Sequence, residues 1–395
     1  MEGLLLFILG LFILAAVFRL NFFVYILYVF FGLYLLSRVW VDRSAKALAC
    51  ERTYLPRAFH GEKIPVKLEV RNKGWLPLPY VRLHESLPVR LIAPNFQRAV
   101  VSFLPREKVS LDYELEGRRR GYYRLGPLTI YTGDLFGIRS VELQIPSDDH
   151  LTVYPRIVPL PELRLPAQTP MGTLATQQRI YEDPSRIVGV RDYQIGDSLR
   201  RMHWKASAAT GRLQVKRLEP AISIEAQVFL NLDAQAYTQG RVHDATELGI
   251  ITAASIAHAL VTKRQTVGLC TNGADPLEDD HRYITVSPRK GTGHLVNILE
   301  VLARVGTSEG RPFAELLQQA SLHLSWGGTA VVITSDADDA LFSSLLMMKR
   351  SGFHVVLIVT DAREPFARIR ERARGVGIVA HEVWQERDLD VWRSQ

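Results

Sequence analysis

The sequence predicts a multi-domain chain that begins with membrane helices, continues into a β-sandwich and ends in an α/β domain. Three observations carry this prediction: an apolar run over residues 4–40, alternation of apolar and polar residues over 50–158, and strand-like runs alternating with helical periods over 223–395. At 395 residues the chain is too long for one ordinary core, so two or three domains are expected. We predict boundaries at 1–42, 50–158, 159–222 and 223–395.

Composition and charge exclude several classes of function. The 48 Lys and Arg residues face 41 Asp and Glu, for a net charge of +7, but the two signs are interspersed. The sequence has no aromatic RNA-binding signature, no zinc-finger spacing and no recognition helix with a dimer motif, so no nucleic-acid partner is expected. The basic excess instead suits a membrane surface. With only two cysteines, Cys50 and Cys270, a disulfide framework is not expected and a reducing compartment fits.

Residues 1–42 predict a transmembrane helical hairpin. The apolar runs Leu4–Phe18 and Phe22–Trp40 are separated by Arg19-Leu20-Asn21, and the second has close to the ~20 residues that a bilayer core needs. A signal peptide is the alternative for the first run, but no basic stretch precedes Leu4 and no small-residue cleavage site follows it. We therefore expect two membrane helices in a tight hairpin.

Positive charges predict how this hairpin is oriented. Five cations follow the second run, whereas the turn holds only Arg19; the five are Arg38, Arg43, Lys46, Arg52 and Arg57. The positive-inside rule then places both termini and the soluble domains in the cytoplasm. The sequence thus predicts a multi-pass protein of the cytoplasmic membrane.

Residues 50–158 predict a small antiparallel β domain. Period-two alternation marks strands at Ile64–Val70, Tyr80–Leu87 and Lys108–Leu115, with a turn at Asn72-Lys73-Gly74. About seven such strands in about 100 residues favour an immunoglobulin-like sandwich without the cysteine pair of antibody domains. Since no catalytic spacing occurs here, we expect a spacer or docking module.

Residues 159–222 combine a proline-rich linker with a densely charged segment from Arg191 to Glu219. Asp197 or Ser198 is a suitable cap for a short helix, on which Arg200, His203 and Trp204 would share one face. Strand-like alternation follows at Leu213–Leu218. The candidate interaction residues are Arg191, Asp192, Tyr193, Gly196, Asp197, Arg200, His203, Trp204, Lys205 and Glu219.

Three interpretations of this segment compete. The first is structural: a lattice of Arg and Asp ties the segment to the next domain, with Trp204 as a buried plug. The second is recognition of an acidic partner or a phosphate by arginine side chains. The third is catalysis by Asp197 and His203 as an acid/base pair. The structural interpretation is favoured, because one histidine with no nucleophile beside it is weak evidence for a reaction.

Residues 223–395 predict a doubly wound, mostly parallel sheet. The predicted strands are Ala226–Leu232, Thr266–Leu269, Ala330–Ile333 and Val355–Val359, and the predicted helices are Ala245–Arg264, His294–Val305, Pro312–Leu322, Ala340–Ser351 and Glu364–Arg374. Ligands of such sheets bind beyond the carboxyl ends of the strands. Those ends carry oxygen-bearing side chains suited to Mg²⁺, namely Asp233, Thr271-Asn272, Thr334-Ser335-Asp336 and Thr360-Asp361.

The charged segment also carries a family resemblance. Its pattern R-D-Y-x-x-G-D-x-x-R-x-x-H-W-K-x-S-A starts at Arg191 and is followed by G-x-L-x-V-K at Gly211 and by Glu219. It resembles the signature of the DUF58 family of bacterial membrane proteins. Further matching motifs begin at Arg57, Arg120, Gly133 and Val153. The resemblance implies two membrane helices, a β domain, the signature and a domain similar to von Willebrand factor A (vWA-like, hence Rossmann-like). It also implies association with MoxR-type AAA+ ATPases.

The vWA resemblance refines the metal hypothesis. Such domains hold a metal with D-x-S-x-S plus a Thr and an Asp from later loops. Here Asp233 matches the first position, both serines are missing, and Thr292 and Asp336 stand for the later ligands. The same residues are good helix caps, which is the favoured interpretation. No cofactor is therefore expected, with Mg²⁺ kept as an alternative.

These observations favour a non-enzymatic, membrane-anchored interaction or scaffold protein whose partner is a MoxR-type AAA+ ATPase. The sequence contains no Walker A loop, nucleophile elbow, H-E-x-x-H motif or dinucleotide-binding glycine pattern, so no catalytic residue is assigned. The alternative is a divalent-metal-dependent enzyme that uses Asp233 and Asp336, with Asp197 and His203 as a possible acid/base pair.

Overall fold

The computed structural model describes residues 10, 13, 21–88, 91–93, 98–135, 137–160, 181–194, 197–221, 225–277, 283–322 and 324–393. The chain divides into two compact units, which are described one at a time. Unit 1 comprises Met1–Arg156 with Leu299–Val305, and unit 2 comprises Ile157–Ile298 with Gly306–Gln395. The finer division into four segments stays a prediction.

Unit 1 begins with a long apolar helix. Helix α2 covers Asn21–Lys46, and its segment Val24–Lys46 has a mean hydropathy of 1.8, enough in length and composition to cross a membrane. Most of its side chains are exposed up to Leu36, whereas Ser37, Val41, Ser44 and Ala45 are buried. The first predicted membrane run lies outside the described residues, apart from Gly10 and Ile13, which are helical.

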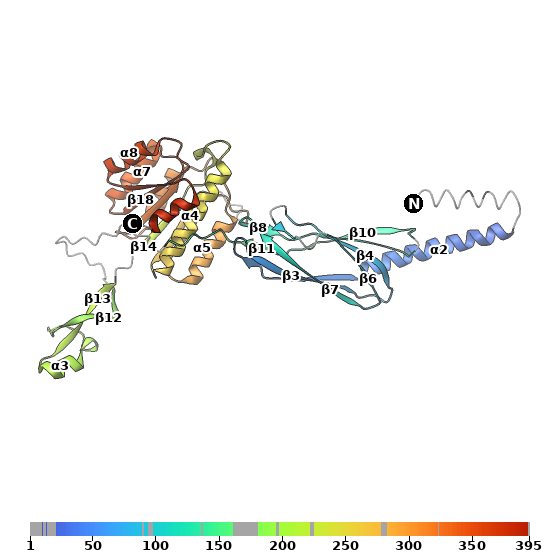
Figure 1. Cartoon of the computed structure of the whole chain (residues 1–395), viewed down its shortest axis with the longest axis horizontal. Coiled ribbons are helices and arrows are strands. Elements are labelled where there is room, and N and C mark those ends of the chain that lie inside the picture. The colour runs from blue at the N-terminus through green and yellow to red at the C-terminus, as the bar shows by residue number, and fades with distance from the viewer. Residues whose placement is uncertain are drawn as a thin grey trace. The chain divides into compact units, whose positions relative to one another are not determined.

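The rest of unit 1 is built from short strands. The strands are β1 (Leu48–Thr53), β2 (Arg57–Ala58), β3 (Lys63–Asn72), β4 (Leu78–Glu85), β5 (Leu91–Ile92), β6 (Arg98–Phe103), β7 (Lys108–Gly117), β8 (Gly121–Arg124), β9 (Leu128–Gly133), β10 (Ser140–Ile145) and β11 (His150–Val153). Two four-stranded sheets have the orders β1-β3-β7-β5 and β10-β9-β4-β6, and a small sheet has the order β2-β11-β8. Figure 1 shows the strands gathered beyond the C-terminal end of α2.

The alternation read from the sequence becomes the core of this β unit. Every second residue of β3 from Ile64 to Asn72 is buried, because successive side chains of a strand point to opposite faces of the sheet. Leu68 of β3, Leu83 of β4 and Ile130 of β9 belong to one apolar cluster, which is formed by side chains of both four-stranded sheets. A β-sandwich architecture results, whereas the immunoglobulin-like topology stays a prediction.

Unit 1 also contains the short segment Leu299–Val305. The guanidinium of Arg120 donates to the backbone carbonyls of Leu302, Ala303 and Val305 at 2.8, 3.1 and 2.9 Å. These carbonyls lie at the end of a helix, where the last C=O groups have no partner within the helix. The segment around Arg119-Arg120-Gly121 thus supplies a cation to a helix C-terminus, which is a favourable electrostatic contact.

Unit 2 begins with a two-stranded hairpin that carries the charged segment. Strand β12 (Tyr181–Asp192) pairs antiparallel with β13 (Gln214–Ala221), with Asp192 opposite Gln214. Between them lie a 3-10 turn, η1 (Leu199–Arg201), and the short helix α3 (Trp204–Thr210). Strand β13 confirms the alternation predicted from Leu213 onward, and the preceding linker lies mostly outside the described residues.

The remainder of unit 2 is an α/β fold with a six-stranded sheet of order β16-β15-β14-β17-β18-β19. The strands are β14 (Glu225–Leu230), β15 (Thr266–Thr271), β16 (Ile284–Arg289), β17 (Thr329–Thr334), β18 (His354–Thr360) and β19 (Val379–Val383). The larger helices are α4 (Val242–Thr262), α5 (Thr292–Arg304), α6 (Phe313–Ser321), α7 (Asp339–Arg350) and α8 (Phe366–Val376), and 3-10 turns occur at η2 (Ala234–Ala236) and η3 (Glu386–Arg393). All four predicted strands and all five predicted helices form. The edge strands β16, antiparallel, and β19, parallel, were not predicted.

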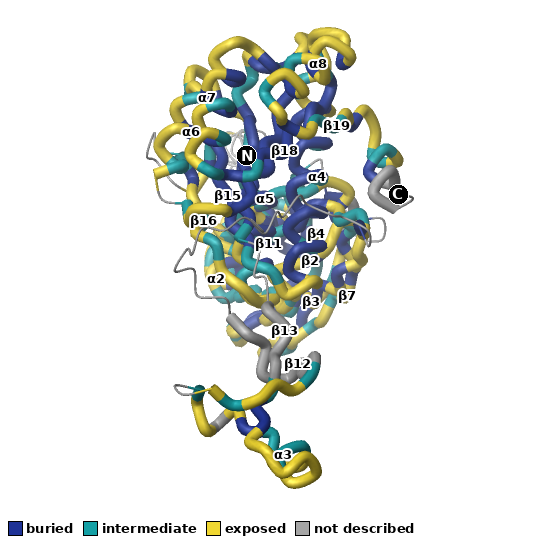
Figure 2. The backbone as a smooth tube through the Cα atoms, turned by 90° about the vertical axis from the view of Figure 1, so that its left-hand side faces the viewer, coloured by how far each residue is buried: buried dark blue, intermediate teal, exposed yellow. Residues whose placement is uncertain are grey.

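Helices cover both faces of this sheet. Phe229 and Val332 share a core cluster with Leu316 of α6 and Leu345 of α7. On the opposite face a Cβ built on Gly249 of α4 would lie 3.3 Å from Leu230, so this glycine lets α4 approach the sheet closely. Helix α4 is itself apolar enough to cross a membrane, but 72% of its most apolar window is buried inside the protein. Figure 2 shows α4 and the central strands as buried, as expected of a core helix.

Candidate functional site

An ion pair with two parallel hydrogen bonds joins Arg191 and Asp197 within the charged segment of the hairpin. Two nitrogens of the Arg191 guanidinium each lie 2.7 Å from an oxygen of the Asp197 carboxylate, which also accepts from the backbone N–H of Gln194 at 3.0 Å. These hydrogen bonds, first from Arg191 and then from the Gln194 amide, lower the pKa of Asp197 below its ordinary value. Asp197 is therefore a carboxylate held in its charged form, whereas a general acid needs a raised pKa.

The predicted helix face across Arg200, His203 and Trp204 is wrong. Helix α3 begins at Trp204, after the separate turn η1, because Met202 is extended and forms a bridge with Val215. The buried Met202 side chain anchors the segment here and breaks the helical register. His203 instead caps α3, with its Nδ1 accepting from the backbone N–H of Ala206 at 3.0 Å.

The two members of the proposed acid/base pair thus have different structural roles. Asp197 binds Arg191 and closes the turn, whereas His203 caps the helix. A cap takes up one of the N–H groups that lack a partner at a helix start. The contacts of both residues support a structural role more directly than a catalytic one.

Trp204 is exposed, so the prediction that its side chain is buried is wrong. Its relative exposure is 67%, and Leu199 and Leu213 are also exposed. Lys205 and Arg212 are exposed on the same short segment, which Figure 2 colours as exposed around α3. Exposed tryptophan together with arginine is the composition found at energetically important points of protein interfaces.

The remaining signature residues are placed as far as the structure describes them. Asp192 accepts from the Gln214 side chain, and the Tyr193 amide donates to the Leu213 carbonyl at 2.9 Å. Both contacts close the base of the loop between the two strands. Gly196 lies outside the described residues, and the side chains of Arg200 and Glu219 are likewise not described.

The second candidate site is the carboxyl edge of the six-stranded sheet. Asp233 follows β14 and accepts from the backbone N–H of Gln235 at 3.1 Å, which makes it the cap of η2. Asp336 follows β17 and lies 3.3 Å from the Arg363 guanidinium, which also donates to the Gln235 carbonyl at 3.0 Å. A guanidinium therefore binds Asp336 and the backbone next to Asp233, in the region where a metal ion would be needed.

Thr292 does not join these two carboxylates. Strand β16 runs antiparallel to β15, with Arg289 opposite Val267, so the chain leaves β16 at the amino end of the parallel strands. The next helix starts at that end, where His294 contacts the Val267 carbonyl at 2.9 Å. Asp233 and Asp336 follow the carboxyl ends of β14 and β17, at the opposite edge. Among the described residues, no three His, Cys, Asp or Glu side chains form a group suited to a metal.

We predict that millimolar Mg²⁺ leaves the melting temperature of the full chain unchanged, because Arg363 already neutralises Asp336. A ligand present at 100 times its dissociation constant would add about 2.7 kcal/mol to the free energy of unfolding, so binding would be easy to detect. Thermal unfolding with Mg²⁺ and with EDTA is the measurement. A Mg²⁺-dependent rise in melting temperature that is lost in Asp336→Ala would restore the metal hypothesis.

A pair of buried amides organises the same edge. The Asn272 side chain accepts from the Leu232 amide at 2.7 Å and donates to Asn231 Oδ1 at 3.0 Å and to the Arg311 carbonyl at 2.9 Å. Asn231 in turn donates to Thr334 Oγ1 at 3.0 Å. These contacts join the ends of β14, β15 and β17. Sequence analysis placed Asn272 at a strand end but did not identify the network, because its members are separated by up to 103 residues.

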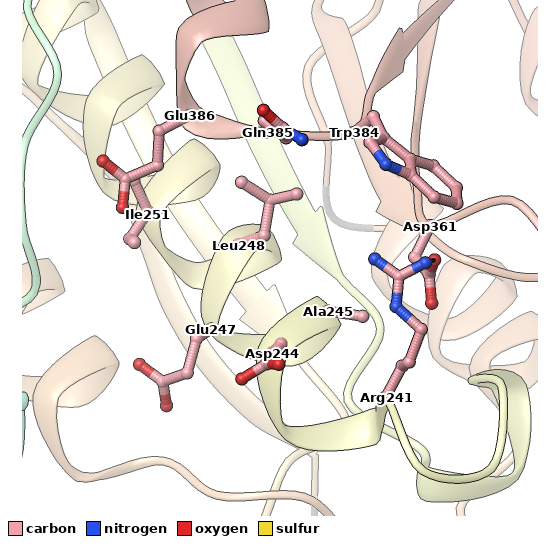
Figure 3. A pocket seen from close by; sticks show the side chains of 10 residues that line it. All are labelled: Arg241, Asp244, Ala245, Glu247, Leu248, Ile251, Asp361, Trp384, Gln385 and Glu386. Atoms are coloured by element: carbon pink, nitrogen blue, oxygen red, sulfur yellow. Dashed lines mark ion pairs between the residues drawn. The ribbon is translucent and has the colours of Figure 1, made fainter.

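The structure adds a pocket that the sequence did not predict. It has a volume of about 330 Å³ and lies in unit 2 between the start of α4, the end of β18 and the segment Trp384–Glu386 (Figure 3). The Arg241 guanidinium pairs with Asp361 at 2.7 Å and stacks on Trp384 with 4.4 Å to the ring centroid. Asp361 is 4% exposed, and its Oδ2 has no hydrogen-bond partner among the described residues.

Carboxylates outnumber cations in the lining of this pocket. Besides Arg241 and Asp361, its ionisable side chains are Asp244, Glu247 and Glu386. Such a lining disfavours phosphate and other anions, because like charges repel in a partly enclosed site. The pocket is therefore poorly suited to a phosphate ligand.

Burial disfavours the thiolate form of both cysteines. Burial raises the pKa of the Cys50 thiol to about 11, and burial also raises the pKa of Cys270. Thiolate is the reactive form, and a raised pKa keeps both thiols protonated near neutral pH.

These features define a chain with an apolar N-terminal helix, a β-sandwich unit and an α/β unit that carries an exposed basic and apolar hairpin. Residues 189–367 match the model of the family described as "Protein of unknown function DUF58". This region spans most of the hairpin and the sheet, and the match supports the assignment to the DUF58 family that the signature predicted.

The chain is similar to a curated protein, "Uncharacterized protein YeaD" of Bacillus subtilis (strain 168). The two are 24% identical over 304 residues, which cover 72% of this chain and 74% of YeaD.

Similarities to solved structures are more distant. A von Willebrand factor type A structure from Catenulispora acidiphila is 12% identical, covers 43% of this chain and 41% of that one, and has a TM-score of 0.29. Alpha-2-macroglobulin of E. coli is 16% identical and has a TM-score of 0.23, over 28% of this chain and only 7% of that chain. Both TM-scores are too low to establish a shared fold.

Proposed function

We propose that this protein is a membrane-anchored, non-enzymatic scaffold of the cytoplasmic membrane that binds a MoxR-type AAA+ ATPase through its β12–β13 hairpin. The exposed Trp204 among exposed cations is the observation that carries the proposal. The ATPase comes from the family resemblance, and the anchor comes from the apolar N-terminal sequence.

The anchor is supported by the composition and charge of α2. Its span from Val24 is apolar enough for a bilayer, and Arg43 and Lys46 lie in its last turn. Cations at this end favour a cytoplasmic location for the residues that follow. The two units then face the compartment in which both thiols stay reduced.

The docking face is supported by the energetics of exposed side chains. Leu199, Trp204 and Leu213 leave apolar area in water, and its burial would contribute roughly 25 cal/mol per Å². The exposed Lys205 and Arg212 add positive charge. An apolar cavity with an acidic rim is the complementary surface, and charge of opposite sign raises the rate of association.

We propose that the protein is not an enzyme because its candidate catalytic side chains are engaged in contacts within the fold. Asp197, His203 and Asp336 each bind a partner within the fold. A catalytic base needs a side chain available to substrate, and each of these has a structural role instead.

We further infer that the α/β unit is vWA-like and that the β unit is immunoglobulin-like. Support comes from the mostly parallel sheet with helices on both faces and from the two four-stranded sheets around one core. Both architectures commonly present surfaces for protein binding, but fold alone does not determine function.

Replacement of Trp204 by alanine is expected to lower recovery of the ATPase about tenfold or more, as loss of an interface tryptophan commonly does. The measurement is a pull-down of the full chain from native membranes, with cross-linking and quantitative mass spectrometry. The matched control is Trp326→Ala, which removes another exposed tryptophan of unit 2 and is expected to keep recovery unchanged.

Two results would contradict the proposal. Wild-type chain that recovers no AAA+ protein, with or without nucleotide, removes the ATPase as partner. Equal losses in Trp204→Ala and Trp326→Ala remove the hairpin as the docking face.

A further inference from the structure

Three turns at one end of the β unit expose large apolar side chains. Trp75, Leu104 and Leu135 are 69%, 66% and 68% exposed. They lie on the β3–β4, β6–β7 and β9–β10 connections, respectively. Exposed apolar residues that gather at one place mark an interaction surface more reliably than scattered ones.

Backbone and side-chain hydrogen bonds hold two of these turns together. Asn72 Nδ2 donates to the Leu104 carbonyl at 3.1 Å, and the Arg106 amide donates to the Gly74 carbonyl at 3.2 Å. The β3–β4 and β6–β7 turns, with Trp75 and Leu104, therefore form one connected surface.

The β3–β4 and β9–β10 turns form hydrogen bonds and an ion pair with the last part of α2 and with Ala47, which follows it. Trp40 Nε1 donates to the Pro77 carbonyl at 3.1 Å, and the Lys73 amide donates to the Ala47 carbonyl at 2.8 Å. On the β9–β10 turn, Asp134 accepts from Ser37 Oγ, and Arg139 pairs with Asp42 at 2.9 Å. Figure 1 shows the C-terminal end of α2 entering the β unit beside β4, β6 and β10.

The length of α2 determines where these contacts lie relative to a bilayer. The 20 residues from Phe22 to Val41 are apolar or aromatic except Gly32, Ser37 and Arg38. At ~1.5 Å per residue they span about 30 Å, which is the thickness of the hydrocarbon core. The contacts of Ser37 and Trp40 with the turns therefore fall within the last five residues of this span, near the boundary with the headgroups.

Charge at this end of the unit suits the headgroup layer. Exposed cations occur on α2 and on both joined turns, namely Arg38, Arg43, Lys46, Lys73 and Arg106. Anionic lipid attracts such residues by about 1 kcal/mol each, and tryptophan favours the same interfacial depth.

We propose that the β3–β4, β6–β7 and β9–β10 turns insert into the interfacial layer of the bilayer, with Trp75, Leu104 and Leu135 in contact with lipid. The proposal rests on the membrane anchoring proposed above. The β unit would then contact the membrane in addition to α2. These turns would hold one end of the β unit against the lipid surface, so that α2 is not its sole attachment.

Lipid contact can be measured in the full chain reconstituted in nanodiscs of phosphatidylcholine and phosphatidylglycerol. Both native cysteines are first replaced by alanine, and an environment-sensitive fluorophore is then attached in Trp75→Cys, Leu104→Cys or Leu135→Cys. The matched control is Leu55→Cys, which is 63% exposed and follows the far end of β1, about 20 Å along the strand at ~3.3 Å per residue. Val29→Cys, within α2, reports the anchor itself.

Lipids with a doxyl quencher near the headgroup should quench the three turn labels roughly twofold or more beyond the Leu55 label, as interfacial insertion requires. If the label at Val29 is quenched but the three turn labels are quenched no more than the label at Leu55, the proposal is overturned and the membrane anchor is retained. Absence of quenching at Val29 as well would overturn both. Turn labels that escape lipid quenching but are shielded from aqueous iodide would indicate a protein partner, which also overturns it.

Discussion

Replacement of Arg52 by alanine is expected to lower the free energy of unfolding of unit 1 by about 3–5 kcal/mol, the usual cost of removing one partner from a buried ion pair. Arg52 Nη2 lies 2.5 Å from Glu85, and both side chains are almost fully buried. The Arg52 guanidinium also binds Asp149 and Ser147, and the Tyr113 hydroxyl donates to Glu85.

Loss of Arg52 would leave the Glu85 carboxylate buried without a countercharge. Burial, and then the charge of Glu85, raise the pKa of the Tyr113 hydroxyl, so Tyr113 stays a neutral donor that cannot replace the cation. The carboxylate would have to take up a proton or open the strands around it. Either response costs free energy near neutral pH.

The measurement is denaturant unfolding of the full chain, followed by hydrogen exchange of the β-unit amides. Lys63→Ala is the control, because Lys63 and Glu114 form an exposed pair at 3.3 Å, whose loss should cost less than about 1 kcal/mol. A double variant, Arg52→Met with Glu85→Leu, should recover much of the stability, because removing both charges leaves no uncompensated ion. Equal costs for Arg52→Ala and Lys63→Ala would show that the pair is not buried as described.

Replacement of Asn272 by alanine is expected to lower the free energy of unfolding of unit 2 by about 3 kcal/mol, because each buried group left without a hydrogen bond costs about 1–3 kcal/mol. The variant leaves the Leu232 amide and the Arg311 carbonyl without these bonds, and Asn231 Oδ1 keeps only its bond from the Asp233 amide. Asn272 is fully buried, so water cannot replace these contacts without opening the sheet edge.

Thermal unfolding of the full chain, with exchange of the Leu232 amide as a local readout, tests this expectation. Asn297→Ala is the control, because Asn297 is exposed on α5 and alanine favours helix. Its stability should stay within about 0.5 kcal/mol of wild type. A similar small change in Asn272→Ala would mean that the amide network does not hold the strand ends.

Several elements of the fold were predictable because local patterns encode them. Alternation in Ile64–Val70 predicts β3, and the short apolar runs around Val331 and Val356 predict β17 and β18. These patterns depend only on side-chain periodicity. Strand β16 escaped prediction because Ser287, Pro288 and Arg289 interrupt its apolar pattern.

The candidate sites were less predictable, because their chemistry depends on partners that are distant in sequence. Strand β16 was not predicted, and it runs antiparallel to β15. Thr292 therefore lies at the opposite edge of the sheet from Asp233 and Asp336. The partner of Asp336 is Arg363, and no spacing rule links those two positions. Helical periodicity predicted a shared face for Arg200, His203 and Trp204, but the contact of Met202 with Val215 overrides it.

The sequence by itself determined the apolar N-terminal segment, the order of β and α/β regions, and the DUF58 signature, because each rests on composition, periodicity or a contiguous motif. Only the tertiary structure decided that Trp204 is exposed, that Asp197 and His203 hold a turn and a helix start, and that Arg363 binds Asp336. The physical reason is that exposure and ion pairing depend on which surfaces meet after folding. Arg363 and Asp336 are 27 positions apart, and even the nearer pairs of Arg191 with Asp197 and of His203 with Ala206 follow no side-chain periodicity.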